Sequence, residues 1–147
     1  MPDKIEWHKA LNVGHDRIDF EHKIFFALIK NFSIAVSENK PRDFLARTLF
    51  EVERYAQFHF LSEENIALDN GESPRELTAH QRIHQYLLNE LQMKIQRLQE
   101  GKEEGQDIVN FLVDWFGLHS EQDRERVDRF DARLGLRSAD DDQAPAS

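Results

Sequence analysis

The sequence predicts an all-α fold, an antiparallel up-down four-helix bundle with an irregular N-terminal arm. Apolar residues recur at alternating steps of three and four along four segments, which is the pattern of helices with one buried face. Short polar turns separate the segments, so consecutive helices should run antiparallel. The chain has 147 residues and 11 phenylalanines, enough for one sizeable core. We therefore expect the bundle over residues 17–132, the arm at 1–16, and an acidic, disordered tail at 133–147.

The composition excludes several classes of function. The formal net charge is −9 and the sequence pI is about 5.2, which argues against nucleic acid and anionic membranes as partners, because both require clustered basic residues. There is no cysteine, so any metal must be held by nitrogen and oxygen ligands. No apolar run is long enough to span a bilayer, and the N-terminus is too polar for a signal peptide, so we expect a cytoplasmic protein.

The first helix is expected over about residues 17–37, after an arm anchored by Trp7, Leu11 and Val13. Its inward stripe contains one histidine among apolar residues: Ile18, His22, Phe25, Ile29, Phe32 and Val36. A single histidine on such a face is more often a satisfied core residue than a metal ligand. The significance of His22 therefore depends on what the other helices present to it.

The second helix places a histidine and a glutamate on its buried face. Pro41 suits its first turn and Asn70-Gly71 suits its end. The inward positions are Leu45, Leu49, Val52, Ala56, His59, Glu63 and Ile66. A buried carboxylate without a partner is very costly, so Glu63 requires a cation. Its neighbour Glu64 falls off the stripe and should be solvated.

The third helix contributes two histidines one turn apart. Ser73, Pro74 and Glu76 form a helix-start signature, with serine as the cap, proline in the first turn and glutamate closing a capping box. The inward stripe that follows is Leu77, His80, His84, Leu87, Leu91, Ile95 and Leu98. Histidines at positions i and i+4 share a helix face and can bind one ion, although this spacing alone is a weak signal.

The fourth helix is expected over about residues 107–130. Its inward positions are Ile108, Leu112, Trp115, His119, Asp123, Val127 and Phe130. His119 and Asp123 repeat the arrangement of His59 and Glu63. Beyond this helix the acidic run Asp140-Asp141-Asp142 lacks apolar residues to bury, which predicts disorder.

Seven polar side chains should thus meet inside one bundle: His22, His59, Glu63, His80, His84, His119 and Asp123. Apolar neighbours cannot satisfy so many buried polar groups, which disfavours a purely structural role. Five imidazoles and two carboxylates are too many for one ion but suit two six-coordinate divalent ions. If both carboxylates and one solvent-derived group bridge the ions, roughly one coordination position stays open for a small ligand.

This ligand set resembles that of the hemerythrin family in its bacterial, single-domain form. The similarity extends over about residues 7–130. It includes several further positions: Trp7, Val13-Gly14, Ile18-Asp19 before His22, His59-Phe60, Glu63-Glu64, and Trp115 before His119. The resemblance implies a cofactor of two non-haem iron ions that binds O₂, or nitric oxide, reversibly.

The resemblance also implies roles for individual residues. One iron would be held by His80, His84 and His119 and the other by His22 and His59, with Glu63, Asp123 and an oxo or hydroxo group as bridges. Phe116 and Trp115 would line the O₂ pocket at the iron that has two histidines. The implied function is oxygen carriage, storage or delivery, rather than catalysis, by a monomer or weak homo-oligomer.

Two positions depart from the family pattern. Members usually separate the fourth-helix histidine and aspartate by five residues, whereas His119 and Asp123 are four apart. Ser120 stands where an aliphatic residue commonly follows the histidine. On a regular helix a four-residue step turns about 400° and returns to the same face. We therefore expect an unbroken α-helix here, with Asp123 facing inward as a bridging ligand.

Other functions are open at this point. A sensor of O₂, nitric oxide or redox state could use the same centre and engage a separate protein through the arm or the tail. A di-iron oxidase or peroxidase of the ferritin-like class would use four carboxylates and two histidines with Glu-x-x-His motifs. Here histidine dominates, and the nearest match is Asp19-x-x-His22. A four-helix protein that holds zinc or manganese in the same site is the remaining alternative.

Overall fold

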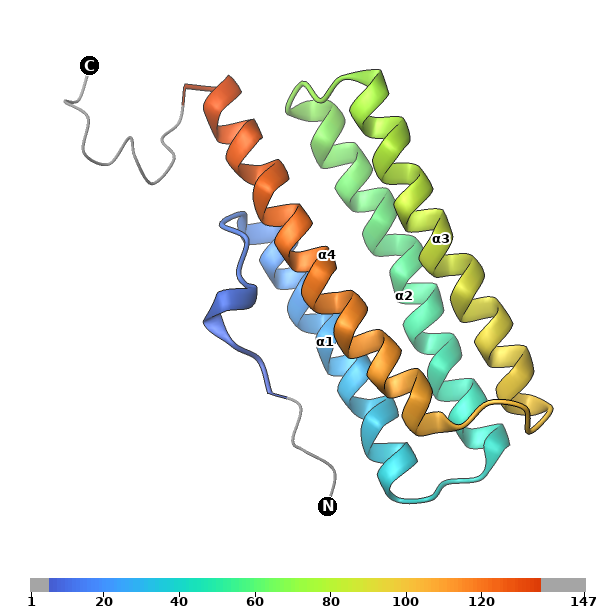
Figure 1. Ribbon diagram of the computed structural model, residues 1–147. Coiled ribbons are helices and arrows are strands. Elements are labelled where there is room, and N and C mark those ends of the chain that lie inside the picture. Colours follow the sequence, from blue (N-terminus) through green and yellow to red (C-terminus); the bar gives the residue numbers. More distant parts are fainter. Residues whose placement is uncertain (1–5, 136–147) are drawn as a thin grey trace.

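The computed structural model describes residues 6–135, and this part of the chain is a bundle of four α-helices without a β-strand (Figure 1). A short 3₁₀ helix, η1, lies in the arm. The elements in chain order are η1 (Lys9–Leu11), α1 (Asp16–Ser37), α2 (Arg42–Asp69), α3 (Pro74–Gln99) and α4 (Gly105–Arg133). The predicted all-α four-helix fold is confirmed. Residues 136–147, most of the predicted disordered tail, lie outside the described residues.

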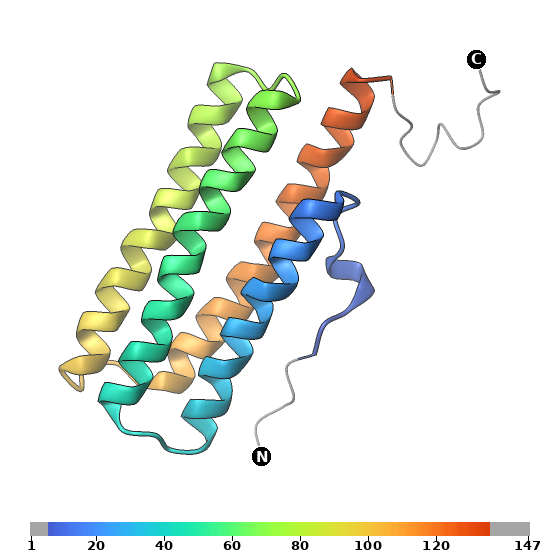
Figure 2. The same ribbon diagram turned by 180° about the vertical axis from the view of Figure 1, so that it is seen from behind.

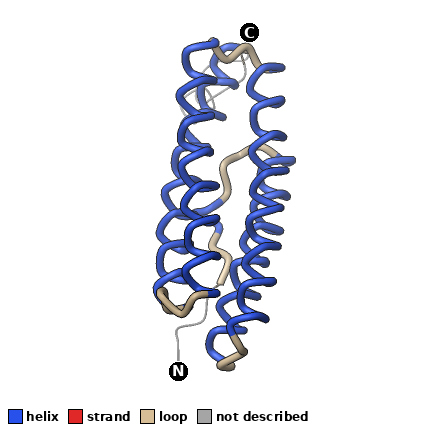
Figure 3. The backbone as a smooth tube through the Cα atoms, turned by 90° about the vertical axis from the view of Figure 1, so that its right-hand side faces the viewer, coloured by secondary structure: helices blue, strands red, loops and turns tan. Residues whose placement is uncertain are grey.

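Successive helices run antiparallel and the connections between them are short (Figures 2 and 3). Packing is extensive between α1 and α2, between α2 and α3, and between α1 and α4. Within residues 6–135 none of the helices is long and apolar enough to cross a membrane.

Local sequence signals determine where the helices begin and end. Ser73 caps α3 as predicted, because its Oγ accepts the Glu76 N–H at 3.2 Å. Pro41 precedes α2 in an extended conformation, one position before the first turn predicted for it. Gly71 has a φ of 78°, the left-handed conformation that glycine adopts readily at a helix end.

The arm is fastened to the start of α1 and to the side of the bundle. The Asp19 carboxylate accepts the Val13 N–H at 2.7 Å and the Gly14 N–H at 3.2 Å. Trp7 packs edge-on against Phe26 of α1 at 5.7 Å and against Phe116 of α4 at 6.3 Å. The arm thereby covers the seam between the first and last helices (Figure 1).

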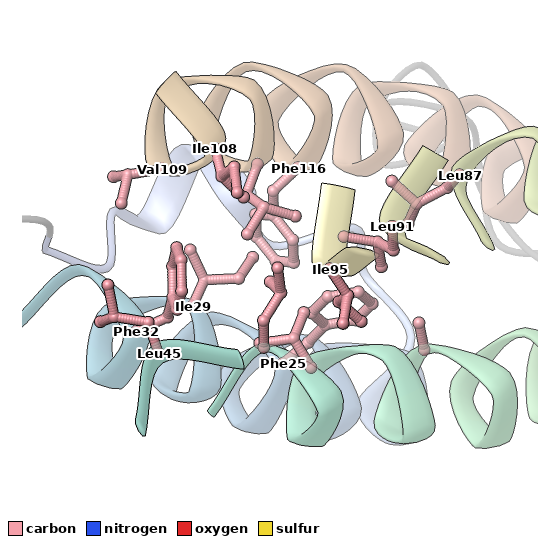
Figure 4. Packing of buried hydrophobic residues seen from close by; sticks show 14 of the residues in the cluster. Phe25, Ile29, Phe32, Leu45, Leu87, Leu91, Ile95, Ile108, Val109 and Phe116 are labelled. Atoms are coloured by element: carbon pink, nitrogen blue, oxygen red, sulfur yellow. The ribbon is translucent and has the colours of Figure 1, made fainter. Parts of the chain in front are cut away.

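Two apolar clusters fill the bundle interior, and polar side chains separate them. The larger cluster draws on all four helices, and Figure 4 shows Phe25, Ile29, Leu91 and Ile108 among its members. The smaller cluster lies toward the α2–α3 turn and consists of Val13, Ile18, Ile66, Ala67, Val127 and Phe130. The predicted stripes are buried except at four half-buried positions, which are Val36, Leu77, His80 and Trp115.

Candidate metal centre

Five of the seven predicted ligands converge between the two apolar clusters. The five are His22 of α1, His59 and Glu63 of α2, and His119 and Asp123 of α4. Each offers one nitrogen or oxygen atom, and these atoms all lie within 4.8 Å of one another. Every member is at most 2% exposed. We call this set the central cluster.

The two carboxylates of the central cluster lie between imidazoles from different helices. Asp123 Oδ2 is 3.0 Å from His22 Nε2 and 3.0 Å from His119 Nε2. Glu63 Oε1 is 3.2 Å from His119 Nε2 and 3.4 Å from His59 Nε2. Each carboxylate therefore connects ligands on separate helices, which is the placement that a bridging ligand needs.

Asp123 reaches this position because α4 is α-helical throughout Gly105–Arg133. The four-residue step from His119 returns to the same face, so both side chains point inward. The prediction of an unbroken helix with a buried Asp123 is confirmed. That Asp123 bridges two ions stays a prediction.

The donor atoms fit a divalent cation. Three buried atoms have no hydrogen-bond partner among the residues that the structure describes. They are both carboxylate oxygens of Glu63 and the Nδ1 atom of His22. A buried carboxylate left in this way is costly unless a positive charge compensates it. The set contains only imidazole nitrogen and carboxylate oxygen, which suit first-row divalent ions.

The two histidines of α3 behave differently from each other. His84 borders the central cluster, because it is buried and its Nε2 is 3.4 Å from Glu63 Oε1. Its ring stacks on Phe60 with centroids 4.0 Å apart. His80 is half-buried and lies outside the cluster, with its Nδ1 3.2 Å from Glu72 Oε1. The assignment of both as metal ligands stays a prediction.

Three glutamates that the sequence did not identify as partners of the histidines form an outer layer around them. Glu21 contacts His59 Nδ1 at 2.7 Å, and Glu64 contacts His84 Nδ1 at 3.3 Å. Glu72 contacts His80 in the same way. A carboxylate on Nδ1 fixes the ring orientation and leaves Nε2 available for a metal.

The expectation that Glu64 is solvated was wrong. Its side chain is only 21% exposed, since the hydrogen bond to His84 and another from Gln81 at 3.3 Å draw it against α3.

Glu21 is itself held in place by neighbouring side chains. Ser62 Oγ donates to Glu21 Oε2 at 2.7 Å, and Arg17 Nε donates to the same oxygen at 3.0 Å. The Tyr55 hydroxyl donates to the Glu21 backbone carbonyl at 3.1 Å. These contacts join α1 and α2 beside His59 and fix its imidazole.

The comparisons with known proteins agree with this geometry. The family model described as the hemerythrin HHE cation binding domain matches residues 13–127. This chain belongs to the hemerythrin family. A bacteriohemerythrin from Clostridium acetobutylicum is 27% identical over 128 residues, which cover 83% of this chain and 98% of that protein. A bacteriohemerythrin from Stenotrophomonas maltophilia is 25% identical over 129 residues, 87% of this chain and 82% of that protein.

In this hemerythrin-family chain without metal, protons compensate the buried carboxylates. Burial lowers the pKa of His119, but the charges of Asp123 and Glu63 outweigh burial and raise that pKa to about 10. Burial likewise opposes protonation of His22, yet its hydrogen bond with Asp123 and the nearby Glu63 carboxylate raise its pKa. The pKa of Glu63 itself is well below its ordinary value, because His59 and His119 oppose the effect of its burial. A bound cation would replace these protons.

The histidines of α3 differ in protonation as well. The pKa of His84 is raised, since its contacts with Glu63 and Glu64 outweigh its burial. The pKa of His80 is lowered, first by burial and then by the charge of Arg126. His80 is thus kept in the neutral form that binds metal.

Aromatic rings close the central cluster toward the larger apolar cluster. Phe116 lies 5.3 Å from His22, and Trp115 stacks on His119 at 4.6 Å. Phe25 packs edge-on against His59 at 5.7 Å. The rings make this side of the centre apolar and keep water away from it.

Proposed function

We propose that this protein binds O₂ reversibly at a pair of non-haem iron ions, as an oxygen carrier, store or delivery protein. The observation that carries the proposal is the central cluster, in which two carboxylates lie between imidazoles of three helices inside an enclosed, aromatic-walled interior. Membership of the hemerythrin family and similarity to two bacteriohemerythrins support it.

The proposed ligands divide between two ions. His22 and His59 would hold one iron, and His80, His84 and His119 the other. Glu63 and Asp123 would bridge them, which agrees with their distances of 3.0 to 3.4 Å from imidazoles of different helices. When bound, the iron pair would supply electrons to O₂ and would take the same electrons back when O₂ leaves.

The side chains around the centre would keep that exchange reversible. Phe116 and Trp115 would line the O₂ pocket and limit the access of water and protons. Glu21, Glu64 and Glu72 would hold three imidazoles in one tautomer through their Nδ1 atoms. The role of this chain is therefore to orient ligands and exclude solvent.

The donor set favours binding over oxidation chemistry. The central cluster and its neighbouring histidines contain five imidazoles and two carboxylates, whereas ferritin-like di-iron proteins use carboxylates predominantly. Carboxylate-rich sites better support high-valent iron, so we propose a binding protein rather than an oxidase or peroxidase.

Metal analysis and visible spectroscopy test this proposal. The iron-loaded protein should contain two irons per chain and should develop a visible band in air that disappears when O₂ is removed. Repeated cycles should restore the same intensity. A single iron per chain, stoichiometric zinc after expression in iron-rich medium, or an irreversible change with turnover of peroxide would each overturn it.

A further inference from the structure

A buried ion pair lies beside the central cluster and belongs to none of the proposed ligands. Glu72, in the turn between α2 and α3, receives two hydrogen bonds from Arg126 of α4. Arg126 Nε is 3.2 Å from Glu72 Oε2, and Arg126 Nη2 is 3.0 Å from Glu72 Oε1. The glutamate is 5% exposed and the arginine 3%.

The pair touches a proposed ligand at each end. On one side, Glu72 Oε1 is 3.2 Å from His80 Nδ1. On the other, Arg126 Nη1 is 3.8 Å from Asp123 Oδ1, the carboxylate oxygen directed away from the imidazoles. A chain of contacts thus runs from α3 through the turn to α4.

Stability alone is a poor explanation for burying two charges here. Desolvation of both ions offsets most of their attraction, and an apolar pair of similar volume is often as stable. A fork-shaped, permanently charged guanidinium does, however, fix a carboxylate in one orientation. The geometry therefore indicates a requirement for orientation.

We propose that Glu72 and Arg126 form a positioning unit for the metal centre, in which Glu72 orients His80 and Arg126 holds both Glu72 and Asp123. This proposal rests on the proposed function, because it assigns His80 and Asp123 to the metal centre. Neither Glu72 nor Arg126 is itself a ligand.

The orientation of His80 depends on this unit more than that of His59 or His84. His59 and His84 are buried and are oriented by glutamates on helices, Glu21 and Glu64. His80 is half-buried, and its carboxylate partner lies in a turn. The turn is closed by the hydrogen bond from the Glu72 N–H to the Ala67 carbonyl at 3.0 Å, and Arg126 then fixes the Glu72 side chain.

The two metal positions should respond differently when the unit is removed. His80 is proposed to hold the same ion as His84 and His119, whereas His22 and His59 hold the other. Loss of the Glu72 carboxylate should weaken the position that includes His80 and spare the other. A purely structural ion pair would weaken both positions together through the fold.

The test is a titration of the metal-free protein with cobalt(II), followed by the visible absorption of the bound ion and by metal analysis. The variants are Glu72→Gln, which keeps the side-chain size but removes the charge, and Arg126→Lys, which keeps the charge but removes the forked guanidinium. Their matched controls are Glu76→Gln and Arg129→Lys, because Arg129 Nε and Glu76 Oε2 make an exposed ion pair at 3.3 Å between the same parts of the chain.

We expect wild-type protein to bind two cobalt ions. Glu72→Gln should weaken one of the two positions about 10- to 100-fold, with the other within about twofold of wild type. Arg126→Lys should weaken the same position by a similar factor and the other position by less, because Arg126 also holds Asp123, the proposed bridge between both ions. The controls should match wild type. Circular dichroism of the metal-free variants checks that each has folded.

Two outcomes would overturn the positioning unit: unchanged affinity at both positions in Glu72→Gln and Arg126→Lys, or an equal loss at both positions in Glu72→Gln. Wild-type protein that binds no cobalt would instead contradict the proposed metal centre. The two failures are therefore distinguishable.

Discussion

The two halves of the bundle interior use the same helices in different ways. Toward the α1–α2 turn, positions such as Phe32, Leu49 and Ile108 are completely buried and apolar. Toward the α2–α3 turn the same helical spacing presents histidines and acids, backed by the smaller apolar cluster. The first half is held together by apolar packing, whereas the second requires protons or metal to compensate its buried charges. The apolar core and the candidate metal centre thereby occupy separate regions of one bundle.

The largest effect should come from the apolar half. Leu49→Ala removes a completely buried side chain of α2 and should lower the free energy of unfolding by about 2–5 kcal/mol. The loss should be equal with and without metal, because Leu49 belongs to the larger apolar cluster. Denaturant unfolding of both forms measures it. A loss that appears only in the metal-loaded protein would mean that the halves are not separate.

The second effect should depend wholly on metal. Metal at 100 to 1,000 times its dissociation constant should stabilise the wild-type protein by about 3–4 kcal/mol per site. In His119→Ala this gain should vanish, because His119 contacts both carboxylates of the central cluster. Thermal unfolding with and without iron(II) checks it. A variant that keeps the full metal-dependent gain would remove His119 from the centre.

The polar half should also make the metal-free protein sensitive to pH. The folded-state pKa of His119, about 10, lies above its ordinary value of 6.5, owing to Asp123 and Glu63 despite its burial. Its contribution is therefore fully present below pH 6.5 and is lost as the pH rises toward 10.

Denaturant unfolding of the metal-free protein from pH 6.5 to 10 should show falling stability, and the metal-loaded protein should show a smaller fall. Equal slopes for the two forms would contradict the idea that protons and metal compensate the same carboxylates.

Phe116 lies on the boundary between the halves, since it belongs to the larger apolar cluster and also packs against His22. Phe116→Leu keeps an apolar side chain but opens the wall beside the centre. We expect unchanged iron content, a modest loss of stability, and a faster irreversible decay of the O₂-dependent band. The decay rate in air measures this, and a wild-type rate would make Phe116 an ordinary core residue.

The smallest effect should come from Ser120. Its hydroxyl is buried and has no hydrogen-bond partner among the residues that the structure describes. Ser120→Ala removes this unpaired group, so stability should be unchanged or raised by up to about 1 kcal/mol. Denaturant unfolding decides it. A clear loss of stability would show that the hydroxyl is hydrogen-bonded in solution.

Helical periodicity predicted the residues of the central cluster but not the glutamates that surround them. His59, Glu63, His119 and Asp123 follow the 3.6-residue repeat, so their common face could be identified from spacing alone. Even the short step between His119 and Asp123 could be interpreted correctly, since a plain α-helix keeps both inward.

The outer layer depends on which helices become neighbours. Glu21 adjoins His22 in sequence yet bonds to His59, 38 positions away. The ion pair between Glu72 and Arg126 joins residues 54 positions apart and has no local pattern. Periodicity also overestimates burial, because His80 follows the apolar stripe but lies near the start of α3 and is only half-buried. Pairing across helices is a tertiary property, and single-sequence periodicity does not contain it.

The stacking of Trp115 on His119 should make tryptophan fluorescence sensitive to changes at the centre. Both tryptophans of the chain lie near the centre, Trp115 against His119 at 4.6 Å and Trp7 against Phe116 at 6.3 Å. Protonation of the stacked imidazole, or a paramagnetic ion bound to it, would quench the indole emission, and O₂ binding would change that quenching again. If the centre binds iron and O₂ as proposed, both events should be measurable through tryptophan fluorescence of the unlabelled protein.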